Sequence, residues 1–474
     1  LERDPIVFYE TAVALFLSVD DPASARMALE AILTEQRDAG AGAEAIAATQ
    51  DRLAALARQS GDPAAAAKYA AAAEATRSAP APARAVGDEG GFHEVEVFYA
   101  TDRARGDETI PAEFYSGQRG TLELGIATVT IPDEHQTAIV ESPSIWKLQF
   151  GPNPAKHVVL QSVTPVDAGD FWDGMRSRLD ERASDDIFVF IHGFNVPFEK
   201  GMRRTAQMAY DMKFPGVPVL YSWPSRGSAL AYVADAATVR VSARRLTHFL
   251  DDLVARSGAG TIHIVAHSMG NRALTDALEL MALRRGAVDG HPPIFDQVIF
   301  AAPDVDAGLF ATMLPTIRPL AQRLTLYASD RDFALATSRR LHGSAPRAGQ
   351  GGEDLLAIEN LDSVDMSALG DDMLAHTYYA SDSSALADLV TLFWSNADPA
   401  RRCGLAPREG QAAVPVWTYE AGSCADTALV EVLTHLQRAR VTTLESAQEV
   451  LTETVLDPYL VETLTPVVRR LLSR

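Results

Sequence analysis

The sequence has 474 residues and a formal net charge of −21 at pH 7, and its length allows two or three domains. The acidic balance argues against nucleic acid as a partner and disfavours electrostatic attraction to anionic membranes. No apolar run approaches the roughly 18 residues of a membrane-spanning helix, so we expect no integral membrane span.

Residues 1–78 are predicted to form an N-terminal helical domain, because alanine is abundant and apolar residues recur at helical spacing. Asp21-Pro22 and Asp62-Pro63 each place an N-capping residue before a proline at the first helical position. The two copies weakly resemble tetratricopeptide repeats; a plain helical bundle is the simpler interpretation. Binding of a protein partner by these helices is kept as an alternative. Residues 79–91 are rich in proline and glycine, which predicts a linker.

Residues 92–397 alternate short apolar runs with helical segments, which predicts an α/β domain with a mostly parallel, doubly wound sheet. We expect the first strand, at 95–99, to lie at an edge. The strands are expected at 95–99, 122–126, 129–131, 147–149, 158–162, 186–191, 218–223, 261–265, 297–302, 324–328 and 355–360. The helices are expected at 171–182, 198–212, 234–255, 272–283, 310–317 and 383–395.

A serine stands between an apolar strand and an alanine- and leucine-rich helix, in Ala266-His267-Ser268-Met269-Gly270. Strand, tight turn and helix with serine at the apex is the context of a nucleophile elbow, whose usual pattern is G-x-S-x-G. Ala266 replaces the first glycine and is still small enough for strand and helix to pass closely. The alternative is a structural turn without chemistry.

The proposed nucleophile needs a general base, and in α/β-hydrolases the acid and then the histidine follow the serine along the chain. His376 follows the last expected strand, where this order requires the base. His291 precedes any acid strand, His342 follows the expected acid too soon, and His435 lies on an amphipathic helix.

For the orienting acid, the strand at 324–328 is followed by Ser329-Asp330-Arg331-Asp332. We prefer Asp332 to Asp330 because the apolar residues after it can anchor a turn. Asp304 and Asp306 are the fallback, with helix capping as their structural alternative.

The oxyanion hole is expected to use two backbone N–H groups, those of Met269 and Phe194. Phe194 lies in His192-Gly193-Phe194-Asn195, directly after the apolar run at 186–191, and Gly193 allows a sharp turn. A metal site at His192, His263 and His267 is disfavoured, because no acidic ligand is near them in the sequence. No cofactor is expected.

Residues 398–474 are expected to form a cysteine loop and a C-terminal helical extension. Cys403 and Cys424 flank a loop with glycine and proline, so a disulfide is sensible in an oxidising compartment, and two free thiols are the equal alternative. The chain begins at Leu1, as a processed or trimmed form would, and a signal peptide would then be invisible. Export to the periplasm or medium is slightly favoured over the cytoplasm.

As a set, the motifs resemble an esterase/lipase-like family of α/β-hydrolases known as a domain of unknown function. The resemblance covers roughly residues 92–397 and rests on segments that occur in the family's order. These are 97–103 (Val-Phe-Tyr-Ala-Thr-Asp-Arg), Ile131-Pro132 with His135, 192–195, 221–225 (Tyr-Ser-Trp-Pro-Ser), 266–271, 302–306 (Ala-Pro-Asp-Val-Asp), 327–329 with Asp332, and His376 with Tyr378-Tyr379. The resemblance implies serine esterase chemistry with Ser268, Asp332 and His376 as the triad.

Two classes of function remain open. The first is a serine hydrolase acting on small or polymeric carboxylic esters; a thioesterase, amidase or peptidase would use the same residues. The second is an inert hydrolase-fold scaffold that binds a protein partner through its helical ends. The natural substrate cannot be inferred from the sequence.

Overall fold

The computed structural model describes most of the chain, in segments separated by short gaps. The described residues are 5–18, 22–38, 43–78, 91–133, 135, 153–226, 232–286, 290, 292–331, 335, 338–339, 343, 345–369, 384–408, 414–420, 436, 441, 443–454, 465 and 468–469. Several residues singled out in the sequence lie outside them: residues 147–149, His291, Asp332, His342, His376, Cys424 and His435.

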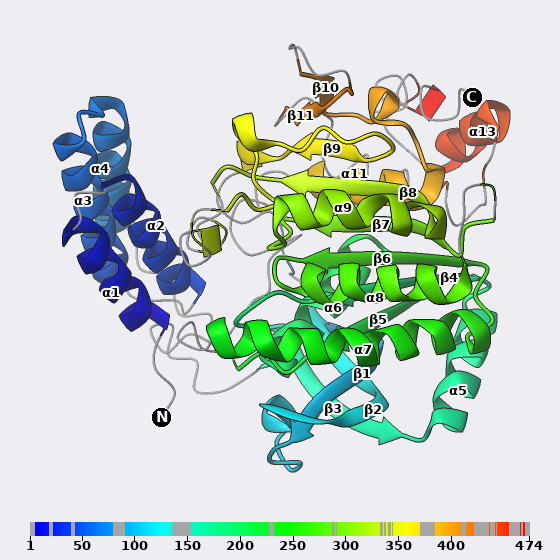
Figure 1. The fold of residues 1–474 in the computed structure, drawn as a ribbon. Coiled ribbons are helices and arrows are strands. Elements are labelled where there is room, and N and C mark those ends of the chain that lie inside the picture. Colours follow the sequence, from blue (N-terminus) through cyan, green and yellow to red (C-terminus); the bar gives the residue numbers. More distant parts are fainter. Residues whose placement is uncertain are drawn as a thin grey trace.

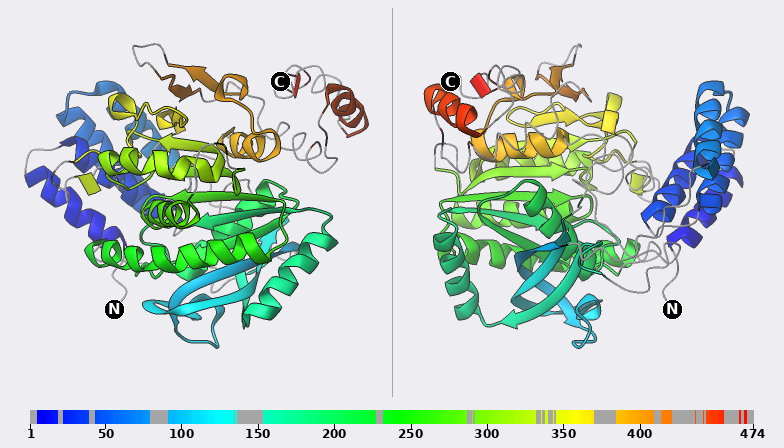
Figure 2. Two further views of the ribbon diagram at one scale, coloured as in Figure 1. Left: turned by 45° about the vertical axis from the view of Figure 1, so that its right-hand side comes forward. Right: turned by 180° about the vertical axis from the view of Figure 1, so that it is seen from behind.

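The described part of the first 78 residues forms four helices, α1 (Pro5–Ser18), α2 (Pro22–Asp38), α3 (Ala43–Gln59) and α4 (Pro63–Ser78). They pack side by side (Figures 1 and 2) around a core of their own that includes Leu29, Ile32 and Leu53. The Asp62 carboxylate accepts a hydrogen bond of 3.0 Å from the Ala65 N–H at the start of α4, which confirms the predicted cap. A partner for these helices stays a prediction.

One sheet of eleven strands organises the rest of the described chain (Figure 1), in the order β10-β11-β9-β8-β7-β6-β4-β5-β1-β2-β3. The strands are β1 (Phe92–Arg105), β2 (Tyr115–Pro132), β3 (Val159–Val166), β4 (Asp186–Ile191), β5 (Val217–Ser222), β6 (Thr261–His267), β7 (Phe295–Ala301), β8 (Ala321–Ala328), β9 (Asp362–Asp365), β10 (Leu405–Pro407) and β11 (Trp417–Tyr419). In this spatial order, all neighbouring strands from β11 through β1 are parallel. The pairs β1–β2, β2–β3 and β10–β11 are antiparallel.

Helices cover both faces of this sheet, so its central strands are buried on both sides. Residues Ile187 and Val189 of β4 belong to one apolar core, and Phe188 and Phe190 belong to the other. The first core includes residues of α5 (Ala168–Glu181), α7 (Tyr232–Arg256), α8 (Gly270–Arg285) and α9 (Ala307–Ile317). The second includes residues of α6 (Phe198–Asp211), α11 (Ser384–Ser395) and α13 (Leu444–Thr454). The mostly parallel, doubly wound sheet predicted from the sequence is confirmed.

The helices of the described segments are all too short or too polar to cross a lipid bilayer.

Three strand predictions need correction. β1 lies between β5 and β2 and is not an edge strand; Val97, Phe98 and Tyr99 are all buried, on alternate faces. The two strands expected at 122–126 and 129–131 are parts of the single long strand β2.

The last expected strand, at 355–360, is a loop, and the strand is β9, which begins two residues later. Leu355, Leu356 and Ile358 are apolar because they pack on the core from this loop. β9 looks polar in the sequence, yet Ser363 is buried and Asp362 pairs with Arg323. Hydropathy therefore places the strand at 355–360 instead of at β9.

The C-terminal extension also contributes to the sheet. β11 pairs in parallel with β9, and β10 pairs antiparallel with β11. These strands have three residues each, too few for a periodic signal, and the sequence did not predict them. Cys403, just before β10, is disulfide-bonded, and the other cysteine of the sequence, Cys424, lies outside the described residues.

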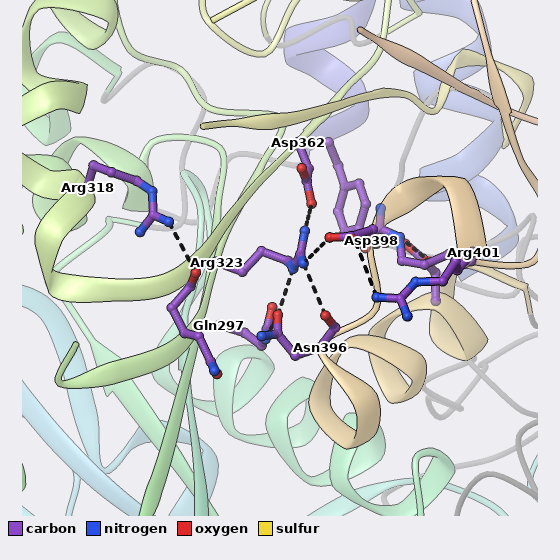
Figure 3. Close-up of polar contacts among 11 residues, drawn as sticks. Gln297, Arg318, Arg323, Asp362, Asn396, Asp398 and Arg401 are labelled. Carbon is purple, nitrogen blue, oxygen red and sulfur yellow. Dashed lines mark hydrogen bonds and ion pairs between the residues drawn. The ribbon is translucent and has the colours of Figure 1, made fainter. Parts of the chain in front are cut away.

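A polar cluster ties the amino ends of β7, β8 and β9 to the chain that follows α11 (Figure 3). The Arg323 guanidinium donates to the side-chain oxygen of Asn396 (2.6 Å) and pairs with Asp362 (2.5 Å) and Asp398 (2.7 Å). The Gln297 amide donates to the same Asn396 oxygen at 2.9 Å. Because β6 to β9 are parallel, this edge is opposite to the one at which β6 leads into Ser268. The cluster therefore stabilises the fold away from Ser268.

Candidate active site

Ser268 is the first residue of a two-residue turn between β6, which ends at His267, and α8, which begins at Gly270. Its φ angle is +48°, a left-handed conformation that costs a non-glycine residue energy and is often retained at functional sites. Its N–H donates to the Ala301 carbonyl (2.9 Å), and its own carbonyl accepts from the N–H groups of Asn271 (3.1 Å) and Asp304 (3.2 Å). These bonds hold the strained turn and occupy the Ser268 backbone.

Small and polar neighbours make this turn possible. A Cβ on Gly270 would lie 2.4 Å from the His192 carbonyl oxygen, so the start of α8 touches the end of β4 and only glycine fits. The buried Asn271 amide nitrogen lies 3.1 Å from each of three carbonyl oxygens, those of Ala266, Ser268 and Ala301. Asn271, for which no role was predicted, therefore joins the turn to the end of β7.

The loop after β4 lies directly against this turn. A Cβ on Gly193 would be 2.8 Å from His267 Nδ1 and 3.1 Å from the Ser268 Cβ, closer than ordinary contact. Asn195, two residues on, has a φ of +60°. The Phe194 ring packs edge-on against Tyr232, with ring centroids 5.3 Å apart. The expected oxyanion loop and the expected nucleophile are therefore neighbours.

Buried polar groups hold this loop. The Trp223 indole N–H donates to the His192 carbonyl at 2.7 Å, and the two rings stack with centroids 5.3 Å apart. Arg103, on β1, reaches His192 and the Val196 carbonyl. Arg103 and Trp223 lie in segments that resemble the family, but no local pattern predicts what either side chain contacts.

The expected acid and base lie outside the described residues, but the strands before them are placed. β8 ends at Ala328, four residues before Asp332, and β9 ends at Asp365, eleven residues before His376. β6, β8 and β9 belong to one parallel set, so all three end at the same edge of the sheet. In such sheets ligands bind outside the carboxyl ends of the strands.

The fallback acids have structural partners. The Asp304 carboxylate pairs with Arg272 (2.9 Å) and Arg347 (3.3 Å) and accepts a hydrogen bond from the Tyr232 hydroxyl (2.7 Å). Asp306 caps α9 by accepting from the Leu309 N–H at 3.0 Å, so its capping alternative is confirmed.

The three histidines considered as metal ligands lie in different surroundings. Burial lowers the pKa of His263 to about 3, and its ring stacks on Phe393 with centroids 4.1 Å apart. Burial, followed by the charge of Arg204, lowers the pKa of His267 to about 4. His192 contacts Arg103 through one ring nitrogen and the Gly193 carbonyl through the other. Across the described part of the chain, no three His, Cys, Asp or Glu side chains form a metal-binding group.

A cavity of about 990 Å³ lies at the amino ends of the parallel strands, opposite to the end at which Ser268 lies. Its lining includes Asp186, Thr261 and Gln322, which lie at the amino ends of β4, β6 and β8, and the ring of Phe393. Ser268 is at the carboxyl end of β6, so this cavity is separate from the candidate active site.

The α/β sheet, the serine turn and the adjoining glycine loop define a protein with an α/β-hydrolase fold. Residues 169–392 match the family model described as "Alpha/beta hydrolase of unknown function (DUF900)", which confirms over these residues the resemblance that the motifs indicated. The match begins within α5 and ends within α11, so it includes β4 to β9. No curated protein and no solved structure gives a significant match to the chain.

Proposed function

We propose that this protein is a serine hydrolase that cleaves carboxylic esters through an acyl-enzyme intermediate. Ser268 is the nucleophile, His376 the general base and Asp332 the acid that orients His376. The N–H groups of Phe194 and Met269 stabilise the oxyanion. The observation that carries this proposal is the left-handed turn at Ser268, held by three backbone hydrogen bonds and contacted by the Gly193 loop.

The proposed reaction uses groups that the chain itself supplies. His376 takes the Ser268 proton while the oxygen attacks the ester carbonyl, and the carbonyl oxygen becomes negative. His376 then returns the proton to the leaving alcohol, and water repeats the sequence on the acyl-enzyme. Because the Ser268 N–H is bonded to Ala301, the oxyanion must find its donors elsewhere. The N–H of the residue after the nucleophile and one from the loop after β4 are the expected pair.

Labelling with a fluorophosphonate probe tests the proposal and separates it from an inert scaffold. Wild-type protein should be labelled once, at Ser268, and should hydrolyse p-nitrophenyl acetate. The Ser268→Ala variant should lose labelling and about 10⁴-fold or more in rate while keeping its melting temperature, because the members of a triad act as a unit. Hydrolysis by Ser268→Ala within about tenfold of wild type would refute the assignment. Thioester and anilide substrates tested in parallel would show which carbonyl group is preferred.

A further inference from the structure

Arg103 is a fully buried arginine whose guanidinium binds the loop after β4. It donates to Ser222 Oγ (2.8 Å) and to the carbonyl oxygens of Ser225 (2.9 Å) and Ser116 (3.3 Å). It also donates to the Val196 carbonyl (2.6 Å) and to His192 Nε2 (3.2 Å). Both ends of the segment 192–196, which contains Phe194, are therefore attached to one side chain.

These contacts determine the tautomer of His192. Its Nδ1 lies 2.8 Å from the Gly193 carbonyl oxygen, which can only accept, so Nδ1 carries the proton. Its Nε2 is then the acceptor for Arg103 and for the Ser222 hydroxyl at 3.1 Å. Burial, followed by the charge of Arg103, holds the pKa of His192 well below its ordinary value, so the ring is neutral at pH 7.

The carbonyl that His192 binds and the N–H assigned to the oxyanion hole belong to the same peptide group, Gly193–Phe194. A hydrogen bond to a peptide oxygen draws electron density toward that oxygen and makes the N–H at the other end a stronger donor. Hydrogen bonds in a chain polarise one another in this way, and the low dielectric of a buried site strengthens the effect. The effect is greatest when the chain begins at a charged donor.

We propose that Arg103 and His192 form a hydrogen-bond relay that positions and polarises the Gly193–Phe194 peptide, so that the Phe194 N–H stabilises the oxyanion. The relay runs from the guanidinium through His192 Nε2 and Nδ1–H to the Gly193 carbonyl. It rests on the proposed function, because that function assigns the Phe194 N–H to the oxyanion. Both side chains are positioning residues, since neither touches the reacting atoms.

The charges around Arg103 suit this role. Its five hydrogen-bond acceptors are all neutral. The carboxylates that raise its pKa, Asp102 and Asp235, bind other groups: Asp102 accepts from Ser242 and Arg245, and Asp235 accepts from Ser225. Burial dominates and lowers the pKa of Arg103 to about 9, so the side chain is still a cation at pH 7. A buried positive charge on the oxyanion side favours the transition state over the neutral ester.

Two substitutions of His192 separate its two bonds. In His192→Asn the amide nitrogen can take the place of Nδ1 and keep the bond to the Gly193 carbonyl, but the Arg103 contact is lost. In His192→Gln the amide oxygen can take the place of Nε2 and keep the Arg103 contact, but the Gly193 bond is lost. We expect kcat to fall about tenfold for His192→Asn and about 100-fold for His192→Gln, with KM nearly unchanged. Affinity for an alkyl boronic acid, which forms a tetrahedral adduct, should fall in parallel with kcat.

Substitutions of the arginine test the other end. Arg103→Lys should lower kcat about tenfold or more, and the double variant Arg103→Lys/His192→Gln should be no slower than His192→Gln, because residues in one network are not additive. Arg105→Lys is the matched control, since Arg105 lies on the same strand and pairs with the surface residues Glu108 and Glu123. If the losses in kcat of the two single variants add in the double variant, or if His192→Gln keeps wild-type kcat, the relay is wrong.

A spectroscopic measurement tests the relay without activity. The sequence contains two Gly-Phe pairs, Gly91-Phe92 and Gly193-Phe194, so labelling glycine with carbonyl ¹³C and phenylalanine with ¹⁵N gives two carbonyl–amide correlations. His192→Gln, and Arg103→Lys if it folds, should shift the Gly193-Phe194 signal and leave the Gly91-Phe92 signal in place. An unmoved Gly193-Phe194 signal would overturn the relay. Undiminished reaction of Ser268→Ala with the fluorophosphonate probe would instead overturn the proposed function, so the two failures are distinguishable.

Discussion

Gly193 and Ser268 lie so close that a single added carbon on Gly193 would come within 3.1 Å of the Ser268 Cβ. The segment that follows β4 and the turn that follows β6 are separated by more than 70 residues in the sequence, and β4 and β6 are neighbours in the sheet. The proposed oxyanion hole requires this contact, because it takes one backbone N–H from each of the two segments.

Substituting Gly193 by alanine should slow catalysis while leaving the fold intact. The new Cβ would also meet His267 Nδ1 at 2.8 Å, so the loop must retreat by a few tenths of an ångström. Loss of one oxyanion donor costs about 10²–10³ in kcat, and partial displacement should cost about 10–100-fold at nearly constant KM. Gly174→Ala is the control, because its Cβ would make only ordinary contacts, the nearest at 3.8 Å. Full activity of Gly193→Ala by steady-state kinetics would contradict this role of the loop.

Substitution by asparagine should affect mainly activity at Asp332 and mainly stability at Asp304. Asp332→Asn should lower kcat by about 10³–10⁴, as loss of the orienting acid does in the triad template, with little change in melting temperature. Asp304→Asn leaves Arg272 and Arg347 without their shared carboxylate, and breaking such a buried pair costs about 3 kcal/mol of stability. Its kcat at a temperature where it is folded should fall far less.

Steady-state rates and thermal unfolding of both variants check this contrast. A larger loss of kcat in Asp304→Asn than in Asp332→Asn would move the orienting acid to the segment after β7.

The sequence predicts the strand, turn and helix around Ser268 because hydropathy and small residues mark them locally. It misplaces β9, since the strand carries polar residues such as Asp362, whose partner Arg323 lies on another strand, and hydropathy does not register such a contact. It gives no role to Arg103, because the contacts of that side chain lie on β2, on β5 and on the loop after β4 and exist only once the sheet is assembled. Local signals are thus predictable, whereas polar contacts between distant segments are not.

His263 should make the protein sensitive to acid. Its ring is buried against Phe393, neither ring nitrogen has a hydrogen-bond partner among the described residues, and burial lowers its pKa to about 3, whereas an unfolded histidine titrates at about 6.5. The unfolded state therefore binds a proton that the folded state does not, so this stability is present above about pH 6.5 and is lost as the pH falls toward 3.

The variant His263→Phe keeps a ring beside Phe393 and removes the titrating group. Its melting temperature should depend less on pH between about 4 and 6.5 than that of the wild type. At pH 7.5 it should be equal or higher, because the variant loses two buried nitrogens that have no hydrogen-bond partner in the described part of the chain. Parallel curves for the two proteins across this range would show that His263 does not titrate on unfolding.

The pH dependence of kcat/KM should report a single histidine, His376. The base must be neutral to take the Ser268 proton, so the rate should rise with pH through one ionisation between about 5.5 and 7.5 and then level off. Burial lowers the pKa of His267 to about 4 and holds the pKa of His192 well below its ordinary value, so neither of these two histidines beside the serine turn should produce the inflection. His376→Ala should remove both the activity and the inflection, whereas His342→Ala and His435→Ala should leave the inflection where it was. A flat wild-type profile from about pH 5 to 8, or a normal profile in His376→Ala, would show that another group is the base, with His342 the first to examine.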